Sequence, residues 1–118
     1  STGPAVRRPF ANATTEAIAT AILVLGVAAI FSKTVSSTGP AAGMGPFLVA
    51  ALVWGIGLSL GGPTGYAINP ARDLAPRVAH AILPIENKGS SDWSYAWVPV
   101  VGPFAGAAIA ALILRAFA

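Results

Sequence analysis

The chain has 118 residues, of which 55% are hydrophobic and 9% are charged, and its mean hydropathy is +0.73. Soluble domains carry roughly 25% charged residues, so a lipid bilayer is the expected surroundings of this chain. The net charge is +3, but its Lys and Arg residues are scattered and not interleaved with aromatic residues, which argues against nucleic-acid binding. The absence of cysteine excludes a disulfide framework and a thiolate metal site.

The first membrane helix is expected over residues 13–32. Residues 1–10 contain two arginines and two prolines but no apolar stretch, so they do not form a signal peptide. Residues 13–32 carry Glu16 as their one charge, and their length is the ~20 residues that a helix needs to cross a bilayer. Since the sequence does not begin with methionine, we also expect it to be a piece of a longer protein.

The next stretch is uncharged and too long for one crossing. Between Lys33 and Arg72 the only ionisable residue is Tyr66. Residues 33–45 are rich in Ser, Thr, Gly and Pro and predict a loop, whereas residues 46–60 predict the second membrane helix. Glycines and a proline follow over residues 61–65, so we expect irregular backbone there, which a bilayer tolerates only if it is buried in protein or lines a wet cavity.

A short helix is expected to follow this irregular segment. Asn69 is a favoured N-cap residue, and Pro70 suits the first helical position. The helix should end near Leu83, which makes it too short to cross the bilayer, and Pro76 weakens its hydrogen bonding. We therefore predict a re-entrant loop and half-helix over residues 61–83.

A polar loop over residues 84–94 precedes the third membrane helix, predicted over residues 95–115. Small residues recur at a spacing of four in the first and third membrane helices. Such faces let membrane helices approach closely. The residues are Ala13, Ala17 and Ala21 in the first helix and Gly102, Gly106 and Ala110 in the third.

Two polar side chains stand at the start of the half-helix. Asn69 can cap the helix with its side-chain oxygen, which leaves its amide NH2 free to donate to a passing solute. A helix amino end carries roughly half a positive charge, so a cation such as Arg72 is disfavoured there by about 0.3–1 kcal/mol. Its guanidinium is suited to holding hydroxyl oxygens and repelling cations at a constriction. The alternative is a salt bridge with Asp73, but adjacent residues on a helix point in different directions.

The run from Asn69 to Asp73, with Gly65–Ile68 before it and Leu74–Arg77 after it, resembles the second signature of the aquaporin superfamily. The aspartate is similar to that of the glycerol-conducting branch, the aquaglyceroporins. The resemblance covers residues 13–118. It implies an all-α membrane protein with three transmembrane helices, a re-entrant loop and a half-helix. That is one inverted repeat, the carboxy-terminal half, of a six-helix channel.

The resemblance also implies roles for individual residues. The motif at the pore centre would be formed by Asn69, Pro70 and Ala71, and the selectivity filter by Arg72, Tyr66 and Gly57. A ladder of acceptors would be formed by the carbonyls of Thr64, Gly65, Tyr66 and Ala67. The loop would be ordered by Glu16 and Asp73. It further implies passive conduction of glycerol, other small neutral solutes and water, with exclusion of ions and protons. No catalytic residue, metal or cofactor is expected, and His80 is assigned no role.

The implied partners are the bilayer of the cell membrane and the amino-terminal half of the same channel, or a second copy of this chain in the opposite orientation. The resemblance also implies that complete channels form homotetramers.

Three alternative functions remain open. The chain could belong to a secondary transporter with broken helices. It could be part of a water-selective aquaporin, since Tyr66 leaves the balance of water and glycerol open. The glycines of residues 55–61 loosely imitate a dinucleotide-binding enzyme, but no ribose-binding carboxylate follows them at the required distance.

Overall fold

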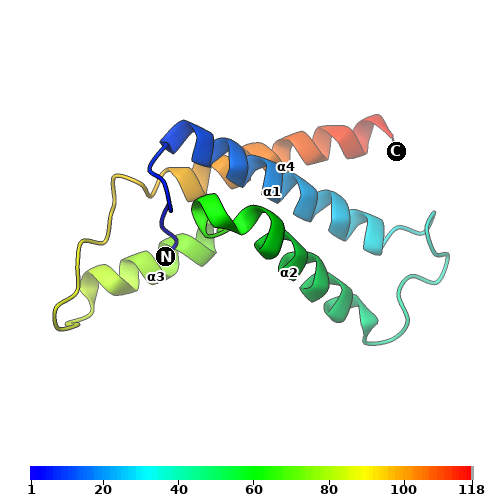
Figure 1. Ribbon diagram of the computed structural model, residues 1–118. Helices are drawn as coiled ribbons and strands as arrows, with labels where there is room; N and C mark the ends of the chain where they lie inside the picture. Colours follow the sequence, from blue (N-terminus) through cyan, green and yellow to red (C-terminus); the bar gives the residue numbers. More distant parts are fainter. Residues whose placement is uncertain (118) are drawn as a thin grey trace.

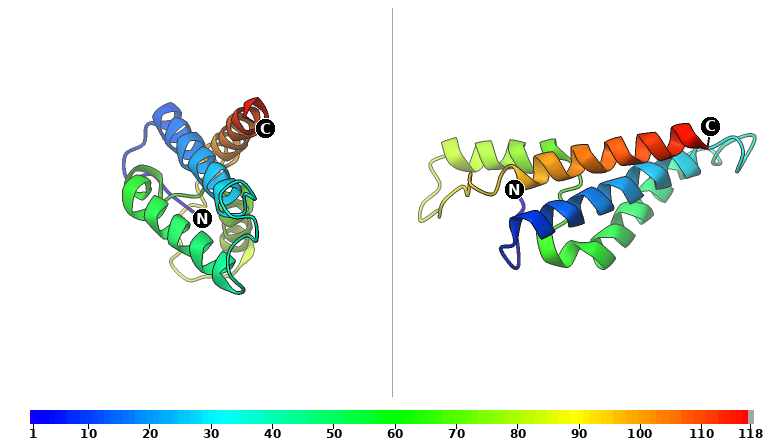
Figure 2. Two further views of the ribbon diagram at one scale, coloured as in Figure 1. Left: turned by 90° about the vertical axis from the view of Figure 1, so that its right-hand side faces the viewer. Right: turned by 90° about the horizontal axis from the view of Figure 1, so that it is seen from above.

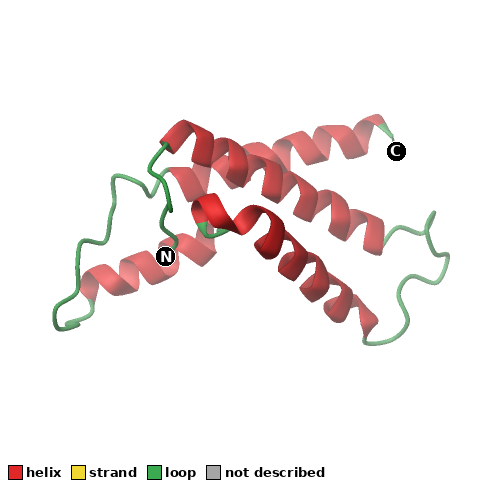
Figure 3. Cartoon of the chain, viewed as in Figure 1, coloured by secondary structure: helices red, strands yellow, loops and turns green. Residues whose placement is uncertain are grey.

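The computed structural model describes residues 1–117 and contains four helices (Figure 1). They are α1 (Pro9–Ile30), α2 (Met44–Thr64), α3 (Pro70–Ile82) and α4 (Val98–Ala116). Loops make up the remainder of this described part, which has no strand (Figure 3). Helices α1, α2 and α4 are long and apolar enough to cross a membrane, whereas α3 has only 13 residues. The predicted all-α class, with three membrane helices and one half-helix, is confirmed.

The outer helices differ from the prediction at their ends. Helix α1 begins at Pro9, four residues before the predicted start, because a proline fits the first turn, where its missing N–H is not needed. Helix α4 begins at Val98 instead of residue 95, with Pro99 in its first turn. The three residues before it form a turn in which the N–H of Val98 donates to the carbonyl of Tyr95 at 3.0 Å.

The end of α2 was predicted wrongly. We expected irregular backbone from residue 61 onward, but α2 continues through Gly61, Gly62 and Pro63 to Thr64. A proline in the last turn removes only one hydrogen bond. The helix ends at Gly65, whose φ of +77° is left-handed and whose N–H donates to the carbonyl of Gly61 at 2.8 Å. The irregular backbone is therefore confined to the few residues between α2 and Pro70.

Helix α1 lies between α2 and α4 and packs most closely against α4 (Figures 1 and 2). At this contact a Cβ atom added to Gly106 would lie 2.1 Å from the carbonyl oxygen of Ala17, and one added to Gly102 would lie 2.9 Å from that of Ala13. Both glycines are buried. The close approach predicted from the small residues is confirmed for this pair of helices.

Helix α3 starts among the ends of the three long helices and runs outward, so that its carboxy end projects beyond them (Figures 1 and 2). The chain leaves α2, turns back beside it over Gly65–Asn69 and enters α3, as expected of a re-entrant segment. The amino-terminal residues lie next to α3, although they precede α1 in the sequence (Figure 1).

The glycine contact between α1 and α4 predicts a large penalty for a single methyl group. We expect Gly106→Ala to lower the thermal midpoint of the protein in detergent, because the new methyl group must push backbone apart, at a cost of about 1–3 kcal/mol. Gly55→Ala in α2 is the matched control, since no atom lies within 4 Å of its added Cβ. Unfolding followed by circular dichroism would contradict the packing if both variants behaved alike.

Candidate functional site

The site begins at the amino end of α3. Asn69 has extended backbone, and its Oδ1 accepts the N–H of Ala71 at 2.8 Å, while Pro70 occupies the first helical position. This is the cap that the sequence predicted. The Asn69 side chain is exposed, so its NH2 group is accessible at the positive end of the helix.

The backbone before Asn69 has an unusual conformation. Tyr66 and Ile68 have φ values of +40° and +46°, which residues other than glycine rarely adopt. Glu16 on α1 holds this backbone, because its two carboxylate oxygens accept the N–H groups of Ala67 at 2.9 Å and Ile68 at 2.7 Å. Glu16 is 1% exposed, so these two N–H groups replace the water that the carboxylate would otherwise bind. Glu16 is expected to order the loop, and these two hydrogen bonds are contacts suited to that role, which itself remains a prediction.

Arg72 lies on the exposed side of the first turn of α3. Its Nη1 donates to the carbonyl of Tyr66 at 2.9 Å and, at 3.4 Å, to that of Gly65. The centre of its guanidinium also stands 4.7 Å from the centroid of the Tyr66 ring, a cation–π distance. Asp73 pairs instead with Arg77, so the alternative of an Arg72–Asp73 salt bridge is wrong.

The ring of Tyr66 lies against two glycines of α2. A Cβ atom added to Gly57 would stand 3.1 Å from the ring, and one added to Gly61 would stand 2.6 Å from it. Three residues assigned to a filter, Gly57, Tyr66 and Arg72, are therefore neighbours in the structure. Gly61 was treated only as a helix breaker, and its contact with the ring was missed.

Thr64 and Ala67 were expected to present carbonyl oxygens together with Gly65 and Tyr66. Thr64 is the last residue of α2, and its buried Oγ1 accepts the N–H of Tyr66 at 3.3 Å. Ala67 is also buried. Only the carbonyls of Gly65 and Tyr66 meet a donor from Arg72. The ladder of four acceptors remains a prediction.

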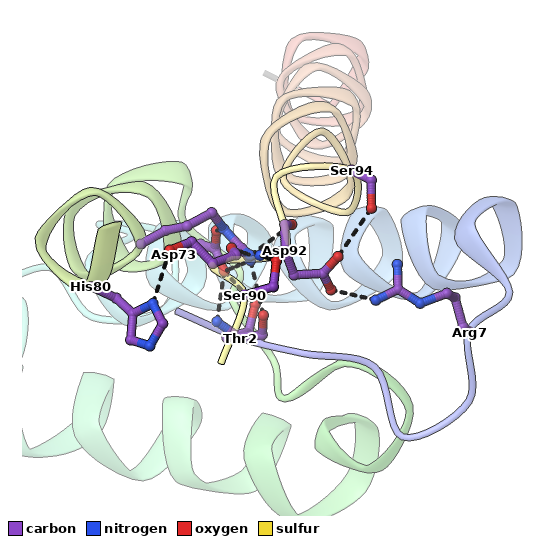
Figure 4. A network of polar contacts seen from close by, with 9 residues as sticks. Thr2, Arg7, Asp73, His80, Ser90, Asp92 and Ser94 are labelled. Atoms are coloured by element: carbon purple, nitrogen blue, oxygen red, sulfur yellow. Dashed lines mark hydrogen bonds and ion pairs between the residues drawn. The ribbon is translucent and has the colours of Figure 1, made fainter. Parts of the chain in front are cut away.

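Asp73 and Arg77 form an ion pair on the buried side of α3. The two side chains are 0% and 1% exposed, and Arg77 donates from Nε to Oδ2 at 2.7 Å and from Nη2 to Oδ1 at 2.8 Å. Arg77 also donates to the carbonyls of Ser91, Asp92 and Thr2. The pair thus joins α3 to the amino terminus and to the loop before α4 (Figure 4). Asp73 was expected to order the loop, whereas Arg77 was missed although Asp and Arg four residues apart on a helix commonly pair.

The loop between α3 and α4 is held by further polar contacts. Nζ of Lys88 donates to the carbonyls of His80, Ala81 and Leu83 at 2.7–2.9 Å, which satisfies the open carbonyl end of α3. His80, which had no assigned role, places its Nδ1 2.9 Å from Oγ of Ser91 (Figure 4). These contacts give His80 and Lys88 structural tasks at the carboxy end of α3.

Asp92 ties this loop to the amino-terminal residues. It forms an ion pair with Arg7 and accepts a hydrogen bond from Oγ of Ser94 at 3.0 Å (Figure 4). The hydrogen bond from Arg7 lowers the pKa of the Asp92 carboxyl, against an opposing effect of its slight burial, and Ser94 adds to the lowering. Asp92 therefore favours its charged form in the folded chain more than in an unfolded one.

The sequence of the chain is similar to that of known proteins. Residues 6–114 match the family model described as "Major intrinsic protein". The chain is 58% identical over 110 residues to a probable glycerol uptake facilitator protein of Thermotoga maritima, covering 93% of this chain and 45% of that protein. It is 56% identical over 115 residues to glycerol uptake facilitator protein 3 of Lactiplantibacillus plantarum, covering 98% and 46%.

The chain is also similar to a relative whose name gives a solute other than glycerol. The D/L-lactic acid transporter of Lactiplantibacillus plantarum is 50% identical to this chain over 117 residues, covering 98% of this chain and 47% of that protein. In every one of these comparisons the chain spans about half the length of the curated relative that it matches.

The two acceptor oxygens of Glu16 predict a stability effect of a substitution that keeps the side-chain shape. In Glu16→Gln an amide NH2 replaces one acceptor opposite the N–H of Ala67 or Ile68, so one buried donor loses its partner, which costs about 1–3 kcal/mol. We expect a lower thermal midpoint in detergent and faster hydrogen exchange at these two amides. Glu86→Gln in the exposed loop is the control. Equal midpoints for the two variants would contradict this role of Glu16.

The lowered pKa of Asp92 predicts part of the acid sensitivity of the fold. Because its folded pKa lies below the unfolded value of about 3.9, the group adds stability above that pH, and this stability is lost as the pH falls through the folded value. Asp92→Asn should therefore lower the thermal midpoint at pH 6 more than at acidic pH values at which Asp92 is protonated in the folded chain. Arg7→Gln should have the same effect, with little further change in the double variant. Additive losses would contradict the pairing.

Proposed function

The chain belongs to the major intrinsic protein family, and from this premise we propose that it supplies the carboxy-terminal half of a passive channel for glycerol, other small neutral solutes and water. One observation carries the proposal beyond family membership. The guanidinium of Arg72 is held on the exposed side of α3 by a backbone carbonyl and an aromatic ring, while its neighbour Asp73 is buried and turned to Arg77. The cation is thus fixed without being neutralised by a carboxylate.

The surroundings of Arg72 suit a small polyol. Donor groups come from Asn69 and Arg72, acceptor groups come from the carbonyls of Gly65 and Tyr66, and carbon surface comes from the Tyr66 ring. Glycerol has hydroxyl groups along one edge and carbon along the other, so such a wall can bind both edges at once. In this proposal Asn69 donates to the solute at the pore centre, and Gly57 leaves room for the Tyr66 ring beside the pore.

The same groups support exclusion of ions and protons. The amino end of α3 carries a partial positive charge, and Arg72 adds a full one on its exposed side. Cations, including hydrated protons, are repelled at a constriction lined in this way. A neutral solute loses its water there and regains hydrogen bonds from the protein.

A complete pore needs a second wall. Asn69 is exposed at the amino end of α3, and the matched relatives are about twice as long as this chain. We propose that the amino-terminal half of the same protein supplies the opposing half-helix and that complete channels assemble as homotetramers in the cell membrane. A second copy of this chain in the opposite orientation is the competing partner, and crosslinks found only between parallel copies would remove it.

Lactic acid is a second candidate solute, favoured by the similarity to a D/L-lactic acid transporter. The undissociated acid is small and neutral, with hydroxyl and carboxyl groups near one another, and it could use the same donors as glycerol. Uptake measured in proteoliposomes at several pH values would separate the two candidates. Passage of the neutral acid should rise as the pH falls, whereas glycerol permeability should not follow the ionisation of the acid.

Arg72 provides the decisive test of the pore. In proteoliposomes that contain this chain with an amino-terminal half, we expect stopped-flow light scattering to show water and glycerol permeation. Arg72→Ala should raise leakage of cations or of larger polyols by roughly tenfold, the scale of one charge-assisted hydrogen bond.

The matched control is Arg115→Ala, which removes an exposed arginine at the carboxy end of α4. It should leave the solute cut-off and the reversal potentials as they are. If Arg72→Ala also leaves both unchanged, the filter assignment is wrong. If no permeation occurs with an amino-terminal half present, the channel proposal itself fails.

A further inference from the structure

The amino-terminal residues Thr2–Arg7, hereafter the strap, connect elements that lie far apart in the sequence. The strap starts beside α3, passes the end of α2, where the N–H of Ala5 donates to the carbonyl of Pro63 at 3.1 Å, and reaches the loop before α4 through the Arg7–Asp92 ion pair. Figures 1 and 4 show this path. Most of its residues are exposed, so specific polar contacts and not burial hold it in place.

Thr2 makes the densest set of these contacts. Its backbone N–H and its Oγ1 both donate to Oδ1 of Asp73, at 2.6 and 2.8 Å, and its carbonyl accepts from Nη2 of Arg77 at 2.9 Å (Figure 4). Oδ1 of Asp73 also accepts from Arg77 and therefore meets three donors. Thr2 thus completes the hydrogen bonding of the buried ion pair next to Arg72 in the chain.

Thr2 also lies close to the irregular segment before α3. A Cβ atom added to Gly65 would lie 3.5 Å from Cβ and 3.6 Å from Cγ2 of Thr2, so the threonine side chain faces Gly65 across a space of about one methyl group. The carbonyl of Gly65 is one of the two that accept from Arg72. One side chain therefore borders both anchors of Arg72, namely the first turn of α3 and the carbonyl segment.

We infer that the strap acts, through Thr2, as a positioning element that sets the solute cut-off at Arg72. This inference rests on the proposed channel function. Thr2 contacts neither Arg72 nor the solute; it fixes the distance between the α3 turn that carries Arg72 and the carbonyls that Arg72 binds. Loosening the strap lets this distance vary, so larger polyols and cations are discriminated less well while the helices remain assembled.

The test distinguishes the effect of the Thr2 hydroxyl from the effect of the side-chain volume. Thr2→Val keeps the side-chain volume against Gly65 but removes the donor to Asp73, whereas Thr2→Ser keeps the donor. Thr38→Val, in the loop at the other end of the bundle, is the matched control. The protein for the measurement is a chimera in which this chain replaces the segment that it matches in the Thermotoga maritima relative.

The first readout is selectivity in proteoliposomes. Thr2→Val should raise the ratio of erythritol to glycerol permeability, and cation leakage, by about two- to tenfold, the scale of one hydrogen bond. Thr2→Ser and Thr38→Val should keep the ratio of the unsubstituted chimera. If Thr2→Val lowers all permeabilities in proportion, the strap is only a structural support and the inference is overturned. An unchanged ratio overturns it as well.

The second readout does not depend on conduction. Trypsin can cut the strap after Arg7, whereas the bond after Arg8 precedes Pro9 and resists cleavage. Thr2→Val should speed the cut after Arg7, detected by mass spectrometry of the new terminus, while Thr2→Ser and Thr38→Val should not. Equal cleavage rates in all variants contradict the contact of Thr2 with Asp73. A chimera that shows this cleavage difference but conducts no glycerol would refute the proposed channel and leave the strap contact standing.

Discussion

The carboxylate of Glu16 is the interaction on which the re-entrant segment depends. A chain that turns back inside apolar surroundings exposes N–H groups that neither a regular helix nor water can satisfy. Glu16 accepts two of them, from Ala67 and Ile68, and these N–H groups in turn compensate its own buried charge. These hydrogen bonds help to stabilise the left-handed backbone at Tyr66 and Ile68.

Two arginines of α3 have opposite tasks, and the helical repeat separates them. Arg77 is buried and donates to Asp73 and to three backbone carbonyls, so its charge is used within the protein. Arg72 lies on the exposed side and meets only carbonyls and a ring. Because Asp73 is committed to Arg77, no carboxylate on α3 neutralises Arg72. The buried ion pair therefore anchors the helix and also leaves the charge of Arg72 without a neutralising carboxylate from α3.

Local patterns in the sequence predicted much of this arrangement, and distant contacts did not follow from them. The cap at Asn69 and the glycine contact between α1 and α4 come from short spacings with direct physical reasons. The end of α2 was misjudged because Gly61 and Pro63 disfavour helices in general, whereas here Gly65 supplies the cap beyond them. The bonds of Thr2 to Asp73 span 71 positions, and no local pattern marks them.

Three parts of this chain contact the re-entrant segment and the first turn of α3. Glu16 accepts two of the N–H groups of the segment, Arg72 donates to two of its carbonyls, and Thr2 of the strap donates to Asp73 in the first turn of α3. Asn69 and Arg72 remain exposed. If this chain forms one half of a pore, as proposed, these internal contacts would lower the entropic cost of ordering the loop when a second half binds.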